Sequence, residues 1–146
     1  MIASSFFAVF VIGMVVTHWD AVTSSAGFDR LAGSDCPVVM IHDGDTIRCG
    51  METIRIENID APELEGSPRC SPYSVQRLYN SQNPAWCDDE MGVASREALA
   101  AFLKVGPIKL TRHATDRYGR TLAKVSVRGR DAGQHLVAMG LARVWH

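Results

Sequence analysis

The sequence has no large net charge, no evident internal repeat and no closely spaced cysteine pair, and each absence narrows the interpretation. The formal net charge is only −1 over 146 residues, so total charge alone does not indicate a nucleic-acid partner. Hydrophobic residues make up 47% and charged residues 21% of the chain, which is typical of one globular domain rather than a disordered one. The absence of a Cys-x-x-Cys pair argues against a zinc site.

The charge is distributed unevenly along the chain. From Met91 onward, ten basic and three acidic residues give a net charge of +7, which leaves −8 for the first ninety residues. Acidic residues cluster at 43–45 and at 88–90. A basic surface beside an acidic pocket suits a metal-dependent enzyme that acts on a polyanion. Charges scattered over an ordinary soluble surface remain the alternative.

The N-terminal segment lacks charged side chains from Met1 to Thr17 and contains the apolar run Phe6–Val16. This run is shorter than the roughly 20 residues that span a bilayer. It resembles the apolar part of an export signal, so residues 1–26 are expected to be a signal peptide, followed by a linker at 27–35. No Lys or Arg precedes the run, which keeps an uncleaved membrane anchor as the alternative and a buried helix as a third. The first two place the folded domain outside the cytoplasm, either secreted or periplasmic.

The four cysteines form an even set, as expected for disulfides in an exported protein. Buried free thiols are the alternative. Four cysteines allow three pairings, and the sequence does not choose among them. We expect Cys36 to pair with Cys49 across the first strands, and Cys70 to pair with Cys87 across a long loop.

The pattern of apolar and β-branched residues predicts five main strands and a short closing strand near the C-terminus. The main strands are expected at Pro37–Ile41, Thr46–Cys49, Thr53–Ile59, Ile108–Thr111 and Thr121–Val127, and the closing strand at Leu141–Trp145.

Helical periodicity is limited to two segments. An amphipathic helix is predicted from Gly92 to Val105, and a second helix is predicted after Asp131, which would cap it, up to Gly140. Residues 64–89 are rich in Ser, Pro, Asn and Gly and are expected to form a long surface loop. The order of elements predicts an α+β, mainly β domain over 36–146: a small five-stranded OB-fold barrel with one helix after the third strand and another near the C-terminus.

Three short motifs contain the residues that suggest a function. They are Asp43-Gly44-Asp45-Thr46, the segment Arg55 to Glu63 that ends in Ile-Asp-Ala-Pro-Glu, and Asp116-Arg-Tyr-Gly-Arg120. Each alone is weak, but their order and spacing resemble the staphylococcal nuclease (thermonuclease-like) family. The resemblance covers nearly all of Cys36 to His146.

The resemblance implies one calcium ion bound by two carboxylates, Asp45 and Asp60, and by the backbone carbonyl of Ala61. Carboxylate and carbonyl oxygens are the ligands that calcium prefers. Asp43 is expected to support these ligands or to form the turn. For Asp45 alone, a turn carboxylate that caps Thr46 is an equal alternative.

The same resemblance assigns the catalytic groups. Arg55 and Arg120 have planar guanidinium groups that match phosphate oxygens, and Glu63 is placed to activate a water molecule. The alternatives are an exposed ion pair for an arginine, for example Arg55 with Glu57, and a surface acid for Glu63. Arg55 and Asp60 are separated by an odd number of residues, so a bend is required before Asp60 if both are to face one site.

Arg117 and Tyr118 match family positions that contact the terminal phosphate and nucleoside of the substrate, although Tyr118 could equally pack on the barrel. The implied function is a calcium-dependent nuclease that cleaves DNA and RNA, preferably single-stranded, with little sequence specificity and leaves 3′-phosphate ends. No stable protein partner is expected. The alternatives are a non-catalytic module of the same fold that binds nucleic acid or peptide, and an envelope protein with an incidental acidic turn. The loop at 64–89 either shapes access to the groove or is only a surface excursion.

Overall fold

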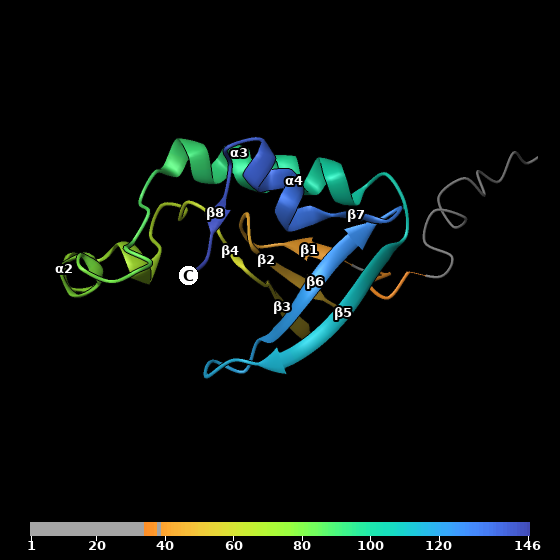
Figure 1. Cartoon of the computed structure of the whole chain (residues 1–146), viewed down its shortest axis with the longest axis horizontal. Coiled ribbons are helices and arrows are strands. Elements are labelled where there is room, and N and C mark those ends of the chain that lie inside the picture. Colours follow the sequence, from red (N-terminus) through yellow and green to blue (C-terminus); the bar gives the residue numbers. More distant parts are fainter. Residues whose placement is uncertain (1–33, 38) are drawn as a thin grey trace, which may run out of the picture.

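The computed structural model describes residues 34–37 and 39–146, which form a curled sheet covered by helices (Figure 1). The main sheet has the order β1-β2-β3-β6-β5, with β7 paired to β6, and β4 and β8 form a second, two-stranded sheet. The five expected strands are therefore present, and the α+β barrel of the OB type is confirmed. The strands are β1 (Val39–Ile41), β2 (Thr46–Cys49), β3 (Glu52–Ile56), β4 (Ile59–Asp60), β5 (Ile108–Thr115), β6 (Thr121–Val127), β7 (Arg130–Asp131) and β8 (Arg143–Val144).

Strand pairing explains how distant motifs meet. Antiparallel hairpins join β1 to β2 and β2 to β3, and a long antiparallel hairpin joins β5 to β6. The three-stranded unit β1-β2-β3 and the β5–β6 hairpin join through β3 and β6, which pair in parallel, with Arg55 opposite Leu122. The parallel pairing is possible because a helix carries the chain across between the two hairpins. It brings the start of β6 next to the strand that contains Arg55.

Two helices cover one side of the sheet. Helix α3 (Asp89–Leu103) begins three residues before the expected Gly92, because the Asp88 side chain accepts a hydrogen bond from Met91 N and two acids occupy the first turn. Helix α4 (Ala132–Ala138) has Asp131 as its N-cap, as expected. The acidic cluster at 88–90 is thus part of a helix start.

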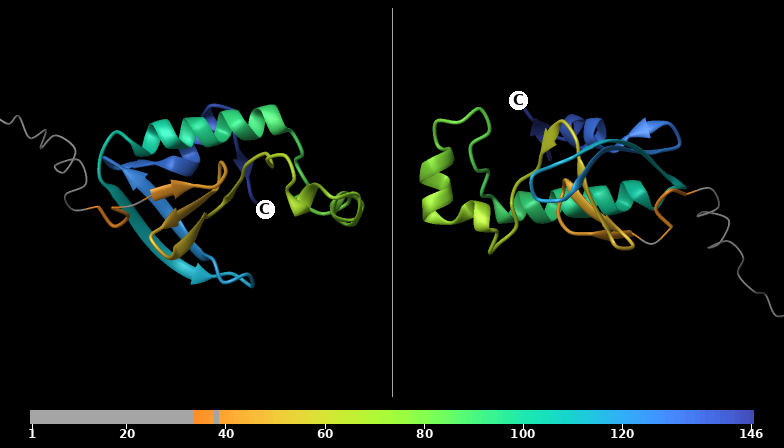
Figure 2. Two further views of the ribbon diagram at one scale, coloured as in Figure 1. Left: turned by 180° about the vertical axis from the view of Figure 1, so that it is seen from behind. Right: turned by 90° about the horizontal axis from the view of Figure 1, so that it is seen from below.

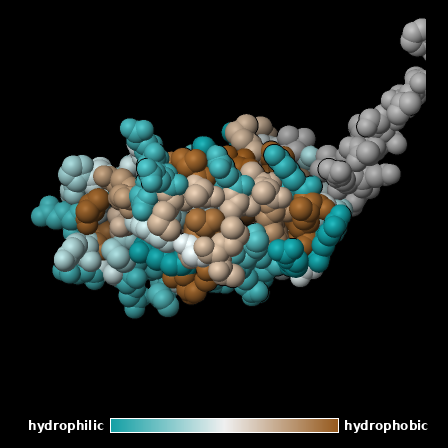
Figure 3. All heavy atoms as spheres, turned by 90° about the horizontal axis from the view of Figure 1, so that it is seen from above, coloured by the Kyte–Doolittle hydropathy of each residue, from teal (hydrophilic) through white to brown (hydrophobic). Residues whose placement is uncertain are grey.

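The core lies between these helices and the concave side of the sheet. Ile47, Ile54 and Val125 on the strands and Leu99 and Leu136 on the helices are fully buried. On the outer face of the helices, hydrophilic residues alternate with small apolar areas (Figure 3). In the described part of the chain, no helix is long and apolar enough to cross a membrane.

The segment at 64–89, expected to be an irregular loop, contains a 3-10 helix, η1 (Pro68–Cys70), and helix α2 (Pro72–Leu78). Each starts with a Ser-Pro pair, in which Ser67 or Ser71 caps the helix and the proline occupies its first turn. The expectation was wrong because serine and proline mark helix starts as well as loops. The whole segment extends from one end of the barrel (Figure 2).

Both expected disulfides are present, Cys36–Cys49 and Cys70–Cys87. The first ties the chain before β1 to the end of β2, and the second closes the loop that contains α2. The predicted signal or anchor at 1–26, and the linker up to residue 33, lie outside the described residues.

Candidate functional site

The β1–β2 turn places the first acidic residues. Asp43 Oδ1 accepts a hydrogen bond from Asp45 N at 2.9 Å, so Asp43 shapes the turn. Asp45 Oδ1 accepts from Thr46 Oγ1 at 3.0 Å, and Asp45 Oδ2 accepts from Ala61 N at 2.8 Å. Asp45 therefore does more than cap its neighbour, because it joins the turn to the segment that follows β4.

Glycine at position 44 allows this turn to approach helix α3 closely. A Cβ atom at Gly44 would lie 2.0 Å from Ser95 Oγ and 2.7 Å from Ala61 Cβ. Neither contact is sterically possible without movement of the turn or of α3. Glycine at position 44 is thus required by the packing of the turn against α3 and Ala61.

The bend expected before Asp60 is present between β3 and β4. Strand β3 ends at Ile56, and Asn58 has a φ of 61°, a left-handed conformation that Asn tolerates better than most residues. The chain then resumes as β4. This interruption cancels the alternation of an extended strand, so Arg55 and Asp60 approach each other, with Nη2 and Oδ1 3.6 Å apart.

Arg55 lies between the two aspartates. Its Nη1 is 3.1 Å from Asp45 Oδ2, and the side chains of Arg55, Asp45 and Asp60 are at most 10% exposed. Its ion pairs are with these two buried carboxylates and not with an exposed neighbour such as Glu57. A buried guanidinium between two carboxylates is rigidly held, because each charge offsets the burial cost of the others.

Two further arginines reach Asp60 from distant segments, and sequence reasoning did not assign either to the site. Arg143 on β8 donates to Asp60 Oδ2 from Nε and Nη2, at 3.1 and 2.7 Å. Arg69 of the loop places Nη1 3.3 Å from Asp60 Oδ1. The ring of Trp145 lies under both Arg55 and Arg69. No local signal identified Arg143, because it meets Asp60 only through the pairing of β4 with β8.

The two aspartates fit a divalent cation in their chemistry. Burial raises the pKa of Asp45 to about 7, although Arg55 opposes this shift, and Asp43 and Asp60 add to it. Asp60 Oδ1 is buried and accepts no hydrogen bond from any described residue. Additional positive charge would therefore stabilise this pair, and its oxygen donors suit calcium. The described residues contain no cluster of three His, Cys, Asp or Glu side chains that could hold a metal, so a cation at this position would also need backbone carbonyl and water oxygens as ligands.

Glu63 lies just after Asp60 in the chain, beyond Ala61 and Pro62. Its Oε2 accepts a hydrogen bond from Ser67 Oγ at 2.6 Å, and its Oε1 lies 3.5 Å from Arg69 Nε. Helix α3 fixes the backbone here, since a Cβ atom at Gly92 would lie only 2.9 Å from Glu63 O. Glu63 is thus held in place by residues on both sides and is only 19% exposed.

The β5–β6 hairpin supplies the third motif. Asp116 Oδ1 accepts from the backbone N of Tyr118 and of Arg120, and its Oδ2 accepts from Arg120 Nε at 2.8 Å. Burial alone would raise the pKa of Asp116, but these hydrogen bonds and the Arg120 charge lower it. Tyr118 is 66% exposed and contacts Arg117, whose Nη2 donates to the tyrosine hydroxyl. Tyr118 is thus not packed into the barrel, although the guanidinium groups of Arg117 and Arg120 lie over its ring, 4.8 and 5.5 Å from the centroid.

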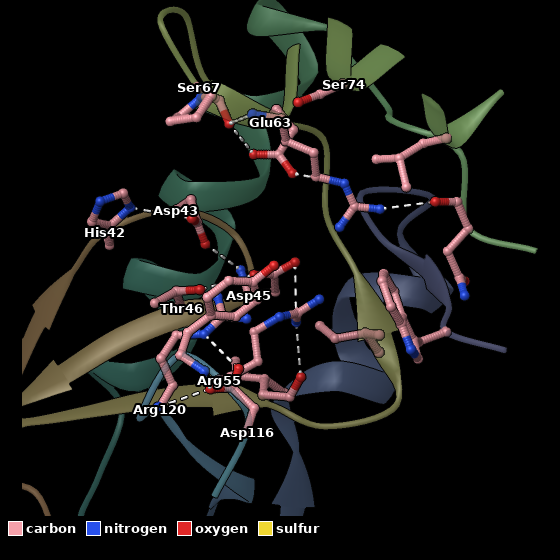
Figure 4. Close-up of a pocket in the computed structure, with 18 of the residues that line it drawn as sticks. His42, Asp43, Asp45, Thr46, Arg55, Glu63, Ser67, Ser74, Asp116 and Arg120 are labelled. Atoms are coloured by element: carbon pink, nitrogen blue, oxygen red, sulfur yellow. Dashed lines mark hydrogen bonds and ion pairs between the residues drawn. The ribbon is translucent and has the colours of Figure 1, made fainter. Parts of the chain in front are cut away.

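One open pocket of about 1400 Å³ brings these groups together, in a space large enough for several nucleotides. In the view of Figure 4, Glu63 and Ser67 lie on one side, Arg55 and Arg120 on the other, and Asp45 between them. Asp60 and Ala61 do not line the pocket in the described part of the chain and are almost fully buried. The expected residues that line it are Asp43, Asp45, Arg55, Glu63, Arg117, Tyr118 and Arg120.

Comparison with known proteins agrees with this arrangement. A curated relative from Haemophilus influenzae, named an uncharacterized endonuclease, is 30% identical over 112 residues, which cover 73% of this chain and 50% of that protein. The chain thus spans about half the length of that relative. The family model for staphylococcal nuclease homologues matches residues 53–146, more than half of the chain. The match includes five of the seven expected residues that line the pocket, all except Asp43 and Asp45. The chain belongs to the staphylococcal nuclease homologue family.

Proposed function

We propose that this protein is a calcium-dependent nuclease that hydrolyses phosphodiester bonds in DNA and RNA with low sequence specificity and leaves 3′-phosphate ends. The observation that supports it most strongly is that one pocket is lined by a buried carboxylate, a second carboxylate held in place, and two guanidinium groups: Asp45, Glu63, Arg55 and Arg120. These are the groups needed to activate water and to offset charge on a phosphate that is attacked. A module that only binds has no need of all four.

In the proposed reaction, Glu63 accepts a proton from a water molecule as the water oxygen attacks phosphorus. The bond from phosphorus to the 5′ oxygen breaks, the 5′ oxygen takes up a proton from solvent water and leaves as a hydroxyl group, and the phosphate stays on the 3′ oxygen. Arg55 and Arg120 donate hydrogen bonds to the phosphate oxygens, whose negative charge grows in the transition state. Arg120 must give up part of its contact with Asp116 to do so, whereas Arg55 is already fixed between Asp45 and Asp60.

Calcium would be held by the carboxylates of Asp45 and Asp60 and by the carbonyl of Ala61. When bound, it would supply positive charge that offsets the phosphate charge and polarises the phosphorus centre. Asp43 would keep the turn in the shape that presents Asp45, since it accepts the hydrogen bond from Asp45 N.

The proposed substrate is single-stranded or frayed nucleic acid. Tyr118 is 66% exposed, so a base can stack on the part of its ring that Arg117 and Arg120 leave uncovered, and Arg117 can contact a phosphate. Contacts to phosphate and stacking read little sequence, which agrees with the proposed low specificity. The two disulfides support an oxidising location, and we propose secretion or export to the periplasm. An N-terminal membrane anchor that faces away from the cytoplasm is the alternative.

The test is incubation of the full chain with single-stranded DNA or RNA, in calcium or in chelator, beside the variants Glu63→Gln and Glu97→Gln. Glu97 is exposed on α3 and does not line the pocket, so it serves as a matched control. We expect degradation in calcium only, a loss of about 10³-fold or more in rate for Glu63→Gln, and normal activity for Glu97→Gln. Equal degradation in all samples would contradict the proposal. Calorimetric titration with calcium, compared between the wild type and Asp45→Asn, tests the metal separately from the cleavage.

One observation favours a second candidate, a module of the same fold that binds nucleic acid without cleaving it. Both oxygens of Asp60 already face guanidinium groups, from Arg143 on one side and from Arg55 and Arg69 on the other. In such a module the arginines would replace the metal. Calcium-independent binding of single-stranded DNA with no cleavage would support this reading over the first.

A further inference from the structure

The loop closed by the Cys70–Cys87 disulfide places the side chain of one arginine, Arg69, against the acidic residues of the site. Arg69 lies on η1, outside the three sequence motifs, and its side chain is only 24% exposed. Its Nη1 is 3.3 Å from Asp60 Oδ1, its Nε is 3.5 Å from Glu63 Oε1, and its Nη2 donates to Asn83 O at 3.0 Å. All three nitrogen atoms of the Arg69 guanidinium group therefore face groups of the protein. This arrangement suits a residue that positions its neighbours rather than one that binds substrate.

The same loop holds both oxygens of the Glu63 carboxylate. Ser67 Oγ donates to Oε2 at 2.6 Å, and the buried Nε of Arg69 makes no hydrogen bond within the described residues but faces Oε1. A buried N–H group without an acceptor is costly, so a small closing movement toward Glu63 would be favourable. The orientation of the proposed base therefore depends on the loop.

The disulfide joins the two loop segments that contact Glu63. Cys70 directly follows Arg69, and Cys87 directly follows Trp86, whose carbonyl accepts the hydrogen bond from Glu63 N at 2.8 Å. Glu63 and Cys87 also form an isolated parallel bridge. The Cys70–Cys87 bond thus joins the residue next to Arg69, which faces the side chain of Glu63, to the residue next to Trp86, which binds its backbone.

We propose that Arg69 is a positioning residue for Glu63, and that the Cys70–Cys87 disulfide keeps Arg69 in place, so that the loop controls the rate of hydrolysis. This inference rests on the proposed nuclease function. It assigns the loop at 64–89 a role inside the active site rather than at its entrance.

The first experiment measures kcat and KM for Arg69→Ala and Arg69→Lys, with Arg48→Ala as the control. Arg48 is an exposed arginine on β2 and does not line the pocket. We expect Arg69→Ala to lower kcat by about 10- to 100-fold with little change in KM, since a misplaced catalytic group loses rate of this order. Arg69→Lys should recover part of the loss, because an ammonium group keeps the charge but cannot reach Asp60, Glu63 and Asn83 together.

A double-mutant cycle tests whether Arg69 acts through Glu63. In the Glu63→Gln background, Arg69→Ala should cause almost no further loss of kcat, because the group that it positions has already been removed. Independent, additive losses would overturn the proposal. So would an unchanged or increased kcat for Arg69→Ala in an active wild-type background, whereas an inactive wild type would count against the nuclease function instead.

The disulfide is tested with matched serine pairs. Cys70→Ser/Cys87→Ser should lower kcat as Arg69→Ala does, and Cys36→Ser/Cys49→Ser should mainly lower the melting temperature. Circular dichroism and thermal melts establish that each variant is folded at the assay temperature. A loop pair with full kcat, in a protein where Arg69→Ala is impaired, would show that Arg69 keeps its place without the disulfide and would overturn that part of the proposal.

Discussion

Replacement of Gly92 by alanine separates the activity of this protein from its stability. Gly92 lies on the face of α3 that contacts the backbone of Pro62 and Glu63, and a Cβ atom there would be 3.1 Å from Pro62 O and 2.9 Å from Glu63 O. Ordinary contact begins near 3.4 Å, so Glu63 or the helix must move by about 0.5 Å. Two opposing effects then act on stability. Overpacking costs about 1–3 kcal/mol, and the better helix propensity of alanine returns about 1 kcal/mol.

We therefore expect Gly92→Ala to be destabilised by only about 0–2 kcal/mol, while kcat falls by about 10-fold or more because Glu63 is displaced. The control is Ala94→Gly on the exposed side of the same helix, which should lose about 1 kcal/mol of stability and keep full activity. Thermal melts and initial rates on single-stranded DNA measure the two quantities. A Gly92→Ala protein that is more stable than the wild type and equally active would refute the reasoning.

Two further changes test the framework of the site, and a third tests an ion pair on the sheet outside the pocket. Gly44→Ala should cost about 1–3 kcal/mol because its Cβ would overlap Ser95 Oγ, and the double variant with Ser95→Gly should recover part of this loss in chemical denaturation. Arg143→Ala should cost about 1–3 kcal/mol, since Asp60 loses two hydrogen bonds but keeps other arginines nearby, and Arg143→Lys should cost less in the same assay. Hydrogen bonds from the side chains of Arg112 on β5 and Thr121 on β6 lower the pKa of Glu52. The ionised Glu52 therefore stabilises the fold above the ordinary pKa of glutamate, and this stabilisation is lost as the pH falls through the lowered pKa. Urea midpoints measured from about pH 6 to pH 3 should therefore fall less steeply for Glu52→Gln than for the wild type.

The sequence predicted those parts of the structure that depend on neighbouring residues. Asp131 caps α4 by accepting a hydrogen bond from Gln134 N, and Asp43 shapes the β1–β2 turn by accepting one from Asp45 N. Both interactions span only a few residues, so local rules predict them. The alternation rule required a bend between Arg55 and Asp60 but did not locate it at Asn58. Local rules state which geometry is needed, and the left-handed residue that provides it is one of several possible solutions.

Other contacts could not be predicted because they join segments that are far apart in the chain. Arg143 and Asp60 are 83 residues apart and meet through the pairing of β4 with β8. The closing strand was predicted, but its partner strand was not. Arg69 lies in the segment 64–89, which was expected to be a surface loop because it is rich in Ser, Pro, Asn and Gly. The helices in that loop and its disulfide direct the side chain inward, and neither effect follows from composition.

The distribution of the arginines indicates how a nucleic acid would meet this site. The cluster around Asp60 contains as many guanidinium groups as carboxylates, so its formal charges cancel and it offers little attraction at a distance. Arg117 differs, since among the described residues it contacts only Tyr118 and no carboxylate, and it lies on an exposed hairpin. An approaching phosphate chain would therefore be attracted first by the β5–β6 hairpin and would reach the neutral cluster later. On the proposed function, the third motif would thus first attract the substrate, and the first two motifs would carry the groups for cleavage in the buried cluster.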